Sequence, residues 1–429
     1  MGIRTTKWSR LSRLGGLAVG IAGEAAGVAG GVVRQGRDAA VDRFHRNTAE
    51  RLTAALGQMK GLPQKVGQIL SMLDAVLPED QRHTYREVLG RLQAHADPLP
   101  WAELEATVVS DLGAPLGARF AELDPTPVAS ASIGQVHRGR LHDGRDVAVK
   151  VQYPGVKEAL HADLEQVELL VRSLGAVVPK TDVKPLVDDV VATFLEELDY
   201  RHEARVQADC HVRWSHDPAI VIPEVVPSHS AARILTTTWL DGDDIGSAEQ
   251  AAQVLKDRWG AAMWRFTWTS ITTHGWVHGD PHPGNLRFLS DGRLGILDFG
   301  ASADLPPRLS DGLARAAALA RHPEESDDAL LGHVLGAVGL PRDLSAEVAR
   351  PWAGFSRLLF EPMRTPGFRF SEDYVRALMV EIQDAKTAAA KTALWRGIPT
   401  PTTQGTVVLM RTAIGQAAVL ARLDAAVDG

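Results

Sequence analysis

The sequence predicts an α+β protein with a helical N-terminal extension, a β-rich middle part and a mostly helical C-terminal half. Three observations predict this fold class: apolar residues recur at helical spacing before residue 100, alternate with polar residues over 120–152, and return to helical spacing after residue 248. A chain of 429 residues with 45% hydrophobic content is also long enough to bury a substantial core, so two or three globular domains are expected.

Residues 1–40 are expected to form a separate Gly/Ala-rich segment. An apolar run at 14–33 follows four basic residues, but Glu24 interrupts it, and a charged side chain is costly at the centre of a bilayer. No short apolar core precedes a cleavage site, which argues against a signal peptide. A loose or docked helix is the favoured interpretation, peripheral contact with a membrane is the alternative, and a spanning helix is the least favoured.

The next two parts differ in their periodicity. Residues 41–110 are predicted as a helical extension, because apolar residues recur at helical spacing on both sides of a Gly-Leu-Pro break. Residues 111–242 contain two predicted strands joined by the turn-prone Asp143–Gly144, then helical spacing over 156–207, then a β-rich run at 232–242.

The last part, residues 243–429, is predicted as mostly helical. Two short strands interrupt the helical spacing on either side of Asp291–Gly292, which is a strong hairpin signal. Prolines near residue 400 then separate a last helix, predicted over 406–425.

Charge and cysteine content narrow the possible partners. The formal net charge of −7 is spread along the chain, and no basic stripe interleaved with aromatic residues marks a groove, so nucleic acid is not an expected partner. The single cysteine, Cys210, cannot form an internal disulfide, and no Cys/His cluster has zinc-ligand spacing. The simplest location is the reducing cytoplasm, with Cys210 as a small packed side chain.

The segment "VHGDPHPGNLRF" carries the first chemical signal. Asp280 precedes Asn285 by five positions, and Asp298 opens an Asp-Phe-Gly after the predicted hairpin. Protein kinases use this order and spacing, because phosphoryl transfer needs a carboxylate to orient the attacking oxygen and metal ions to bridge the phosphates. We expect Asp280 to be the base or orienting carboxylate, and Asn285 and Asp298 to be Mg²⁺ ligands through oxygen donors. His278 is expected to orient this loop rather than to transfer protons.

A nucleotide, ATP or ADP, is the expected ligand. Lys150 ends the predicted strand "VAVK" and is expected to reach the phosphates, and Thr237 and Trp239 are expected near the adenine. The usual three-glycine phosphate loop is replaced by a small-residue loop that has fewer routes to positive φ, formed by Ala129, Ser130, Ala131 and Ser132. Nucleotide binding with altered geometry is therefore predicted.

Four further sequence blocks stand out: "KVGQ", "SIGQVH", "ELDYRHEA" and "HGDPHPGN" with "DFG". In these blocks the chain resembles the UbiB (ADCK-type) family of atypical protein-kinase-like proteins, over about residues 45–425. The resemblance implies a two-lobed protein-kinase-like fold whose helical extension folds over the active site, with Lys65 and Gln68 facing the nucleotide. It also implies that Glu203 is the helix partner of Lys150, and that Glu197 and Asp199 hold the Lys65 segment.

Two positions depart from the expected patterns. His282 stands where a typical serine/threonine kinase loop carries a Lys, so a fixed cation is missing from the transferring phosphate, although the family shares this His. Val206 stands where the family often has Asn, which puts one polar contact in doubt.

The resemblance implies an ATP- and Mg²⁺-dependent kinase or ATPase that supports isoprenoid quinone or other lipid metabolism. A lipid or membrane surface is then a candidate partner, with peripheral contact at the inner face of the membrane, and the sequence does not identify protein partners. A nucleotide-binding pseudokinase that regulates or scaffolds without phosphoryl transfer is the alternative. A small-molecule phosphotransferase is less favoured, because it has no use for "KVGQ" or "SIGQVH".

Overall fold

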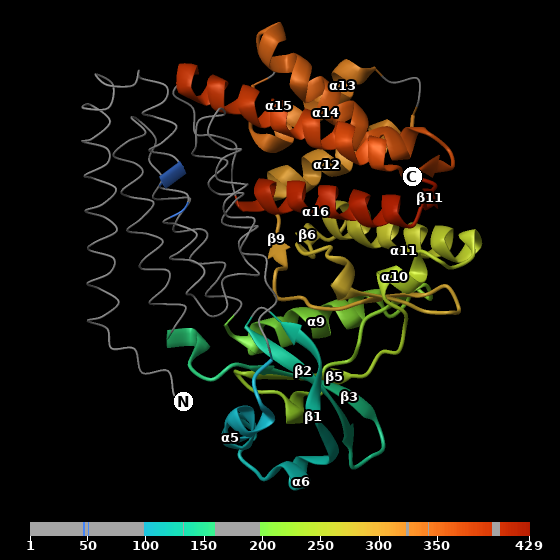
Figure 1. Ribbon diagram of the computed structural model, residues 1–429. Helices are drawn as coiled ribbons and strands as arrows, with labels where there is room; N and C mark the ends of the chain where they lie inside the picture. The colour runs from blue at the N-terminus through green and yellow to red at the C-terminus, as the bar shows by residue number, and fades with distance from the viewer. Residues whose placement is uncertain are drawn as a thin grey trace, which may run out of the picture. The chain divides into compact units, whose positions relative to one another are not determined.

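The computed structural model describes residues 46–47, 50, 98–131, 133–158, 198–322, 326–341, 343–396 and 404–429. The chain divides into two compact units (Figure 1). One unit comprises residues up to Arg201 together with Val226–Thr236, and the other comprises His202–Val225 and Thr237–Gly429. The predicted segment 1–40 and nearly all of the predicted helical extension lie outside the described residues.

The first unit is built on a four-stranded sheet with the order β1-β2-β3-β5. Strands β1, β2 and β3 pair in antiparallel fashion, and Gly144 in the turn between β2 and β3 has a φ of +90°. This confirms the hairpin predicted at Asp143–Gly144. The strands and helices of this unit are β1 (Phe120–Ala131), β2 (Gly134–Leu141), β3 (Asp146–Gln152), β5 (Ile234–Thr238), α5 (Trp101–Leu112), α6 (Leu116–Arg119) and the 3₁₀ turn η3 (Pro227–His229).

Helix α5 closes one face of this sheet. Its buried residues fall on one side at helical spacing, and it ends at Gly113 in the left-handed region with φ 65°. Burial alternates along β3 from Asp146 to Val151, with Val147, Val149 and Val151 fully buried in the same core as α5. Since side chains alternate along a strand, Lys150 lies on the opposite face from these valines.

The second unit is mostly helical, as predicted. Short strands form three small sheets with the orders β4-β8-β7, β6-β9 and β10-β11. The helices are α9 (Tyr200–Trp214), which begins at the end of the first unit, α10 (Ile245–Ala248), α11 (Gln253–Thr272), α12 (Pro307–Ala320), α13 (Asp327–Val338), α14 (Ala346–Arg364), α15 (Glu372–Arg396) and α16 (Gln404–Arg422), with the 3₁₀ turn η4 (Pro283–Asn285). The strands are β4 (Ile220–Val221), β6 (Trp276–Val277), β7 (Leu286–Phe288), β8 (Leu294–Ile296), β9 (Ala303–Asp304), β10 (Phe368–Arg369) and β11 (Ala426–Val427).

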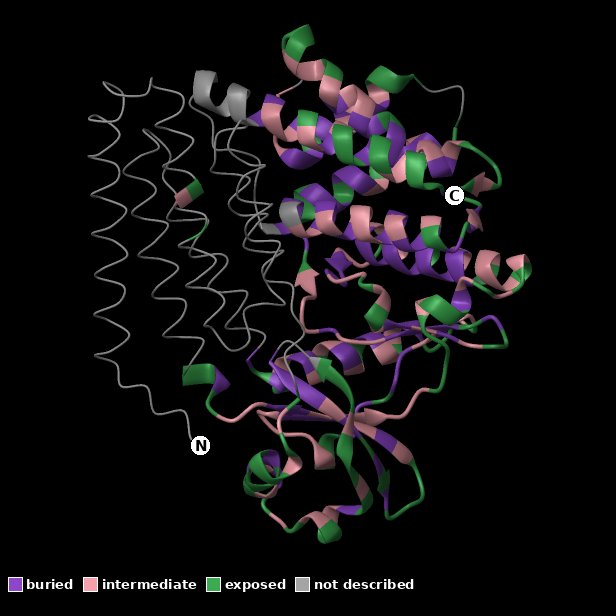
Figure 2. Cartoon of the chain, in the orientation of Figure 1, coloured by how far each residue is buried: buried purple, intermediate pink, exposed green. Residues whose placement is uncertain are grey.

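Helix α11 runs through the core of the second unit, and buried residues follow its length (Figure 2). Its aromatic side chains pack in series, with Trp264 5.4 Å from Trp268 and Trp268 5.4 Å from Phe360 between ring centroids. Helices α12 and α16 and strand β6 pack against it. Cys210 is buried here as predicted, and burial raises the pKa of its thiol to about 12, so it is an unreactive packed side chain.

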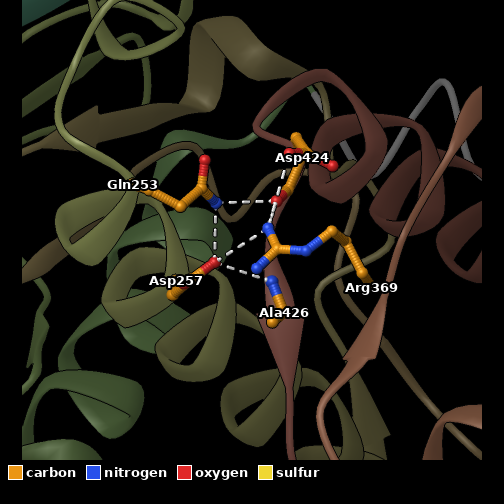
Figure 3. A network of polar contacts seen from close by, with 5 residues as sticks. All are labelled: Gln253, Asp257, Arg369, Asp424 and Ala426. Carbon is orange, nitrogen blue, oxygen red and sulfur yellow. Dashed lines mark hydrogen bonds and ion pairs between the residues drawn. The ribbon is translucent and has the colours of Figure 1, made fainter.

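A polar network fixes the C-terminal strand β11 to α11 (Figure 3). The carboxylate of Asp257 accepts hydrogen bonds from Gln253 Nε2 and from the backbone N–H of Ala426, both at 2.8 Å. The same Gln253 nitrogen donates to the carbonyl oxygen of Asp424 at 2.8 Å, and Arg369 donates to this oxygen as well. Asp424 has a φ of 49°, so the chain reverses there, and the predicted last helix ends at Arg422 rather than at 425.

The predicted α+β fold class is confirmed, with an antiparallel sheet in the first unit and a mostly helical second unit. Within the described ranges, none of the helices combines the length and the apolar character that crossing a bilayer requires.

Candidate functional site

The loop that carries Asp280 follows strand β6, which pairs with β9. Gly279 has a φ of +81°, and a Cβ at this position would lie only 2.0 Å from the carbonyl oxygen of Ala301. Both the dihedral angle and the close approach therefore require glycine. This turn brings the loop beside the segment that follows the Asp-Phe-Gly.

Asp280 and Asn285 are directly hydrogen-bonded. Asn285 Nδ2 donates to the carboxylate oxygen Oδ2 of Asp280 at 2.9 Å and to its carbonyl oxygen at 3.2 Å. Since both of these partners are acceptors, the NH₂ group of the amide must face Asp280. The amide oxygen of Asn285 takes no part in either bond, and it is the atom with which this side chain would bind a hard cation.

A short 3₁₀ turn, η4, sets the spacing between these two residues. The Nδ1 atom of His282 accepts a hydrogen bond from the Gly284 N–H at 3.0 Å, and Asn285 N–H donates to the carbonyl of His282 at 2.9 Å. His282 therefore caps the turn with its own ring. Pro283 fits the first position of this turn, because it has no N–H to satisfy.

Asp298 lies next to Asn285 because the two ends of the β7-β8 hairpin are paired. Leu297 N–H donates to the carbonyl of Asn285 at 2.8 Å, and Leu286 is paired with Ile296. Asp298 has a φ of 58°, a conformation that costs a non-glycine residue about 1 kcal/mol or more. Its Oδ1 accepts from Gly300 N–H at 3.3 Å. The backbone strain and this bond fix where the carboxylate points.

Glu203 on α9 approaches the same Asp-Phe-Gly and is 4% exposed. A Cβ placed on Gly300 would lie 3.3 Å from Asp298 Oδ1 and 3.4 Å from Glu203 Oε2. Two carboxylates therefore approach one point in the second unit, where a cation would offset their repulsion. The sequence expectation places Glu203 beside Lys150, which belongs to the first unit, and this pairing stays a prediction.

His278 contacts backbone atoms on both sides of its ring. Its Nδ1 faces the backbone N–H of Asp280 at 3.4 Å and its Nε2 faces the carbonyl of Leu297 at 3.0 Å, so Nε2 carries the proton and the ring is neutral. Burial lowers the pKa of this imidazole, and the nearby carboxylates of Asp280 and Asp298 oppose that shift. The ring packs against Phe299 at 5.0 Å. These contacts are those of a residue that orients the loop.

Lys150 in the first unit lies over an aromatic ring. Its Nζ is 5.1 Å from the ring centroid of Tyr200, a distance typical of a cation–π interaction. Tyr200 is almost fully buried, and a Cβ at Gly134 would lie 3.0 Å from its hydroxyl and 2.2 Å from the carbonyl oxygen of Val151. The sequence did not predict a role for Tyr200, although it lies within "ELDYRHEA", because only the acidic residues of this block have a charge that suits an expected role.

The small-residue stretch before β2 is not a loop over residues 129–131. Ala129 pairs with Val136, Ser130 with Gln135 and Ala131 with Gly134, so the stretch is the end of β1. The prediction of a loop there is wrong, because pairing with β2 continues to the last residue before the turn. Ser132 lies outside the described residues, and a nucleotide contact by these four residues remains a prediction.

Two further residues of "SIGQVH" are structural. Gln135 and His137 are both fully buried, and Gln135 accepts from Leu99 N–H at 2.9 Å and donates to the Leu99 carbonyl at 3.2 Å. Gln135 Nε2 also lies 2.9 Å from His137 Nε2, while His137 Nδ1 donates to the carbonyl of Asp124 at 2.8 Å. This series of hydrogen bonds connects Leu99, just before α5, to the sheet. The sequence alone does not reveal this role.

The remaining predicted nucleotide contacts are described only in part. Thr237 is half-buried and forms an isolated antiparallel β-bridge with Val225 in the second unit. Trp239 Nε1 donates to Asp241 Oδ1 at 2.7 Å. Lys65 and Gln68 lie outside the described residues. Among the described residues no group of three or more His, Cys, Asp or Glu is gathered as a metal site, so a cation here would depend on few protein ligands.

The fold and these motifs define a protein-kinase-like protein. Residues 91–325, more than half of the 429-residue chain, match the family model described as the ABC1 atypical kinase-like domain, and the chain belongs to this family. This confirms the resemblance to the UbiB family of atypical kinases.

Several relatives have been named. The chain is 33% identical over 310 residues to the mitochondrial atypical kinase COQ8 of Saccharomyces cerevisiae, covering 70% of this chain and 60% of that protein. It is 31% identical over 293 residues to the chloroplastic protein ACTIVITY OF BC1 COMPLEX KINASE 3 of Arabidopsis thaliana, covering 66% of this chain and 37% of the relative. The chain thus spans less than two thirds of these relatives.

A solved structure is similar over a larger share of both chains. It is that of Rv3197 from Mycobacterium tuberculosis in complex with erythromycin, with 33% sequence identity and a TM-score of 0.62. The match covers 91% of this chain and 96% of the other.

Proposed function

We propose that this protein is an ATP- and Mg²⁺-dependent atypical kinase or ATPase. The observation that carries the proposal is the hydrogen-bonded pair of Asp280 and Asn285, joined through Leu297 to the strained Asp298 within one unit. Phosphoryl transfer depends mostly on positioning and charge neutralisation, and these three residues offer the oxygen donors that it requires.

The residues fit a magnesium ion by their chemistry. Asp298 and the amide oxygen of Asn285 would hold the ion, and the approach of the Glu203 carboxylate to Gly300 adds negative charge that a cation would offset. The chemistry that a magnesium ion held by these residues would supply is neutralisation of the charge on the nucleotide phosphates.

The other side chains would act around the nucleotide. Lys150 would contact the phosphates, and the Tyr200 ring holds its ammonium when no phosphate is bound. Asp280 would orient the attacking oxygen and accept its proton, and neutral His278 would keep the Asp280 backbone in place. Ala129, Ser130, Ala131, Ser132, Thr237, Trp239, Lys65 and Gln68 would supply the remaining nucleotide contacts.

The proposed phosphoryl acceptor is an isoprenoid quinone precursor or another lipid, or else the activity supports the metabolism of such a lipid. The kinship with proteins named COQ8 and the family resemblance support this proposal. A lipid substrate would be met at a membrane surface, so peripheral membrane contact belongs to the same proposal.

A regulator without turnover is the second candidate function. The pairing of Ala129, Ser130 and Ala131 with β2 favours it, since backbone amides in a strand do not form the concave nest that a glycine-rich loop offers to phosphates. The protein would then bind a nucleotide and change the assembly of a partner.

The structure solved with erythromycin points to a further candidate ligand. Because that structure resembles this chain over 91% of its length, a macrolide is a candidate ligand here. Titration of the purified protein with erythromycin, with and without ADP, tests this directly, and absence of heat or of a thermal shift would dismiss it.

The test of the main proposal is release of phosphate from ATP with Mg²⁺, measured with and without anionic liposomes. Turnover by the parent that is lost in Asp280→Asn and kept in Asp291→Asn supports an ATPase or kinase. Asp291 is a matched control, because it is an exposed carboxylate that pairs with Arg293 in the β7-β8 turn. Tight nucleotide binding without turnover would favour the regulator.

A further inference from the structure

The C-terminal helix α16 packs directly against the loop that carries Asp280. A Cβ at Gly279 would lie 3.3 Å from Val408 Cγ1, and a Cβ at Gly415 would lie 2.5 Å from Pro281 Cγ. Val408 and Gly415 therefore contact the residues on either side of Asp280. The close approach at Gly415 depends on the absence of a side chain there.

Arg411 lies on the same face of α16, three residues after Val408 and four before Gly415, a spacing that places all three in one row. The next residue, Thr412, is buried and lines a small cavity together with His278, Asp280 and Pro281. By its place on the helix, Arg411 is thus opposite Asp280, between the two contact points.

In the part of the protein that the structure describes, Arg411 has a buried polar atom without a partner. Its Nε is buried and finds no hydrogen-bond partner, and neither Asp280 nor another described carboxylate forms an ion pair with it. A buried donor without a partner is unfavourable, and the guanidinium keeps its charge at all ordinary pH values. The groups around it include neutral His278, whose low pKa comes first from burial and in smaller part from Arg411.

Between β6 and β7 the loop itself carries no Lys or Arg, and Arg287 in β7 donates to the Gly284 carbonyl at 3.2 Å. His282 occupies the position of the usual kinase lysine, but it is exposed and its Nδ1 is engaged by the Gly284 N–H. A histidine ring whose Nδ1 accepts a hydrogen bond does not offer the permanent charge of a lysine or arginine.

We propose that Arg411 of α16 binds a phosphoryl oxyanion at the Asp280 loop and so provides the fixed cation that His282 does not. This inference rests on the proposed function, because the phosphoryl group is that of a transfer site. The planar guanidinium of Arg411 can donate to two oxygens of a phosphate at once, and one of these bonds would satisfy the buried Nε. The oxyanion is either the terminal phosphate of ATP or a phosphate on the second substrate.

Titration calorimetry with ATP, with ADP, and with inorganic phosphate in the presence of ADP, each with Mg²⁺, distinguishes these sources. The proteins are the parent, Arg411→Gln, Arg411→Lys and the control Arg422→Gln. Arg422 lies on the same helix and pairs at the surface with Glu249, away from the loop. If Arg411 binds the terminal phosphate, Arg411→Gln should lower the affinity for ATP by about tenfold or more and leave the affinity for ADP unchanged.

If Arg411 binds a phosphate on the second substrate instead, ATP and ADP should bind Arg411→Gln as they bind the parent, and inorganic phosphate should lose about tenfold in affinity. In either case Arg411→Lys should keep part of the affinity and Arg422→Gln all of it. Unchanged affinity of Arg411→Gln for all three ligands would overturn the proposal.

The parent protein offers a second measurement that does not depend on a folded variant. Inorganic phosphate with ADP and Mg²⁺, or ATP with Mg²⁺, should slow the modification of Arg411 by phenylglyoxal, read on its peptide by mass spectrometry. Unchanged rates with both would contradict the proposal. A parent that binds these anions through Arg411 but releases no phosphate from ATP would refute the proposed turnover and leave the anion site standing.

Discussion

The amide nitrogen of Asn285 donates to the carboxylate of Asp280 at 2.9 Å, so the two residues that "GDPHPGN" separates by five positions are in direct contact. The contact explains why the spacing is required, since η4 is the short turn that joins them. The amide nitrogen of Asn285 thus fixes Asp280, and its amide oxygen is the atom that would bind the proposed cation.

Replacing Asn285 by Asp should therefore harm the site although the side chain keeps its size. Two carboxylates would face each other at the place of the hydrogen bond, which raises the pKa of one of them. We expect Mg²⁺-dependent phosphate release near neutral pH to fall about 100-fold or more. Steady-state kinetics check this, with thermal unfolding as the folding control, and unchanged turnover would show that the contact is dispensable.

Gly279 should tolerate no side chain. Gly279→Ala would place a Cβ 2.0 Å from the Ala301 carbonyl at a φ of +81°, and we expect a loss of about 3 kcal/mol or more of unfolding free energy. Gly144→Ala is the matched control, because Gly144 has a similar φ of +90° and nothing within 4 Å of the new Cβ. It should cost only about 1 kcal/mol. Urea unfolding of both variants measures the difference, and equal losses would contradict the steric argument.

Stability should decrease on mild acidification. Burial lowers the pKa of His137, and the same direction holds for His278 and His274. The unfolded chain then binds protons that the folded protein excludes, so the free energy of unfolding falls as the pH drops below about 6.5 towards the lower folded-state pKa values.

His137 should account for part of this slope. A His137→Gln variant cannot be protonated there, so its stability should fall less steeply between about pH 7 and pH 5 than that of the parent. Urea unfolding at several pH values measures both slopes. A variant as pH-sensitive as the parent would exclude His137 as a contributor.

Tyr200 should hold Lys150 ready for the nucleotide through its ring rather than its hydroxyl. Tyr200→Leu removes the ring that lies 5.1 Å from the ammonium, and we expect ATP affinity to fall by roughly threefold or more. Tyr200→Phe keeps the ring and should bind ATP like the parent. Fluorescence or calorimetric titration decides, and equal affinities of the Leu and Phe variants would argue against the cation–π contact.

Local sequence signals predicted much of this structure. The turns at Asp143–Gly144 and Asp291–Gly292 were predictable because an Asp-Gly pair suits a hairpin whatever surrounds it. The position of the Asp280 loop before the β7-β8 hairpin was predictable for the same reason.

Features that depend on distant partners were not predictable. The stretch Ala129–Ala131 looked like a loop by composition, but its pairing with β2 makes it a strand. Gln135 and His137 belong to a family motif, but their structural role depends on their hydrogen bonds to Leu99 and Asp124, which are distant in the sequence. The packing of α16 against the Asp280 loop joins segments more than a hundred residues apart, and no local sequence pattern predicts such a contact.

The most direct test of the central claim is the Mg²⁺ dependence of nucleotide affinity in the parent, Asp298→Asn and Asp291→Asn. If Asp298 is a ligand of the nucleotide-bound metal, Mg²⁺ should strengthen ATP binding to the parent and to Asp291→Asn, and this gain should be lost in Asp298→Asn. Equal Mg²⁺-dependent gains in all three proteins, or no nucleotide binding by the parent, would contradict the account.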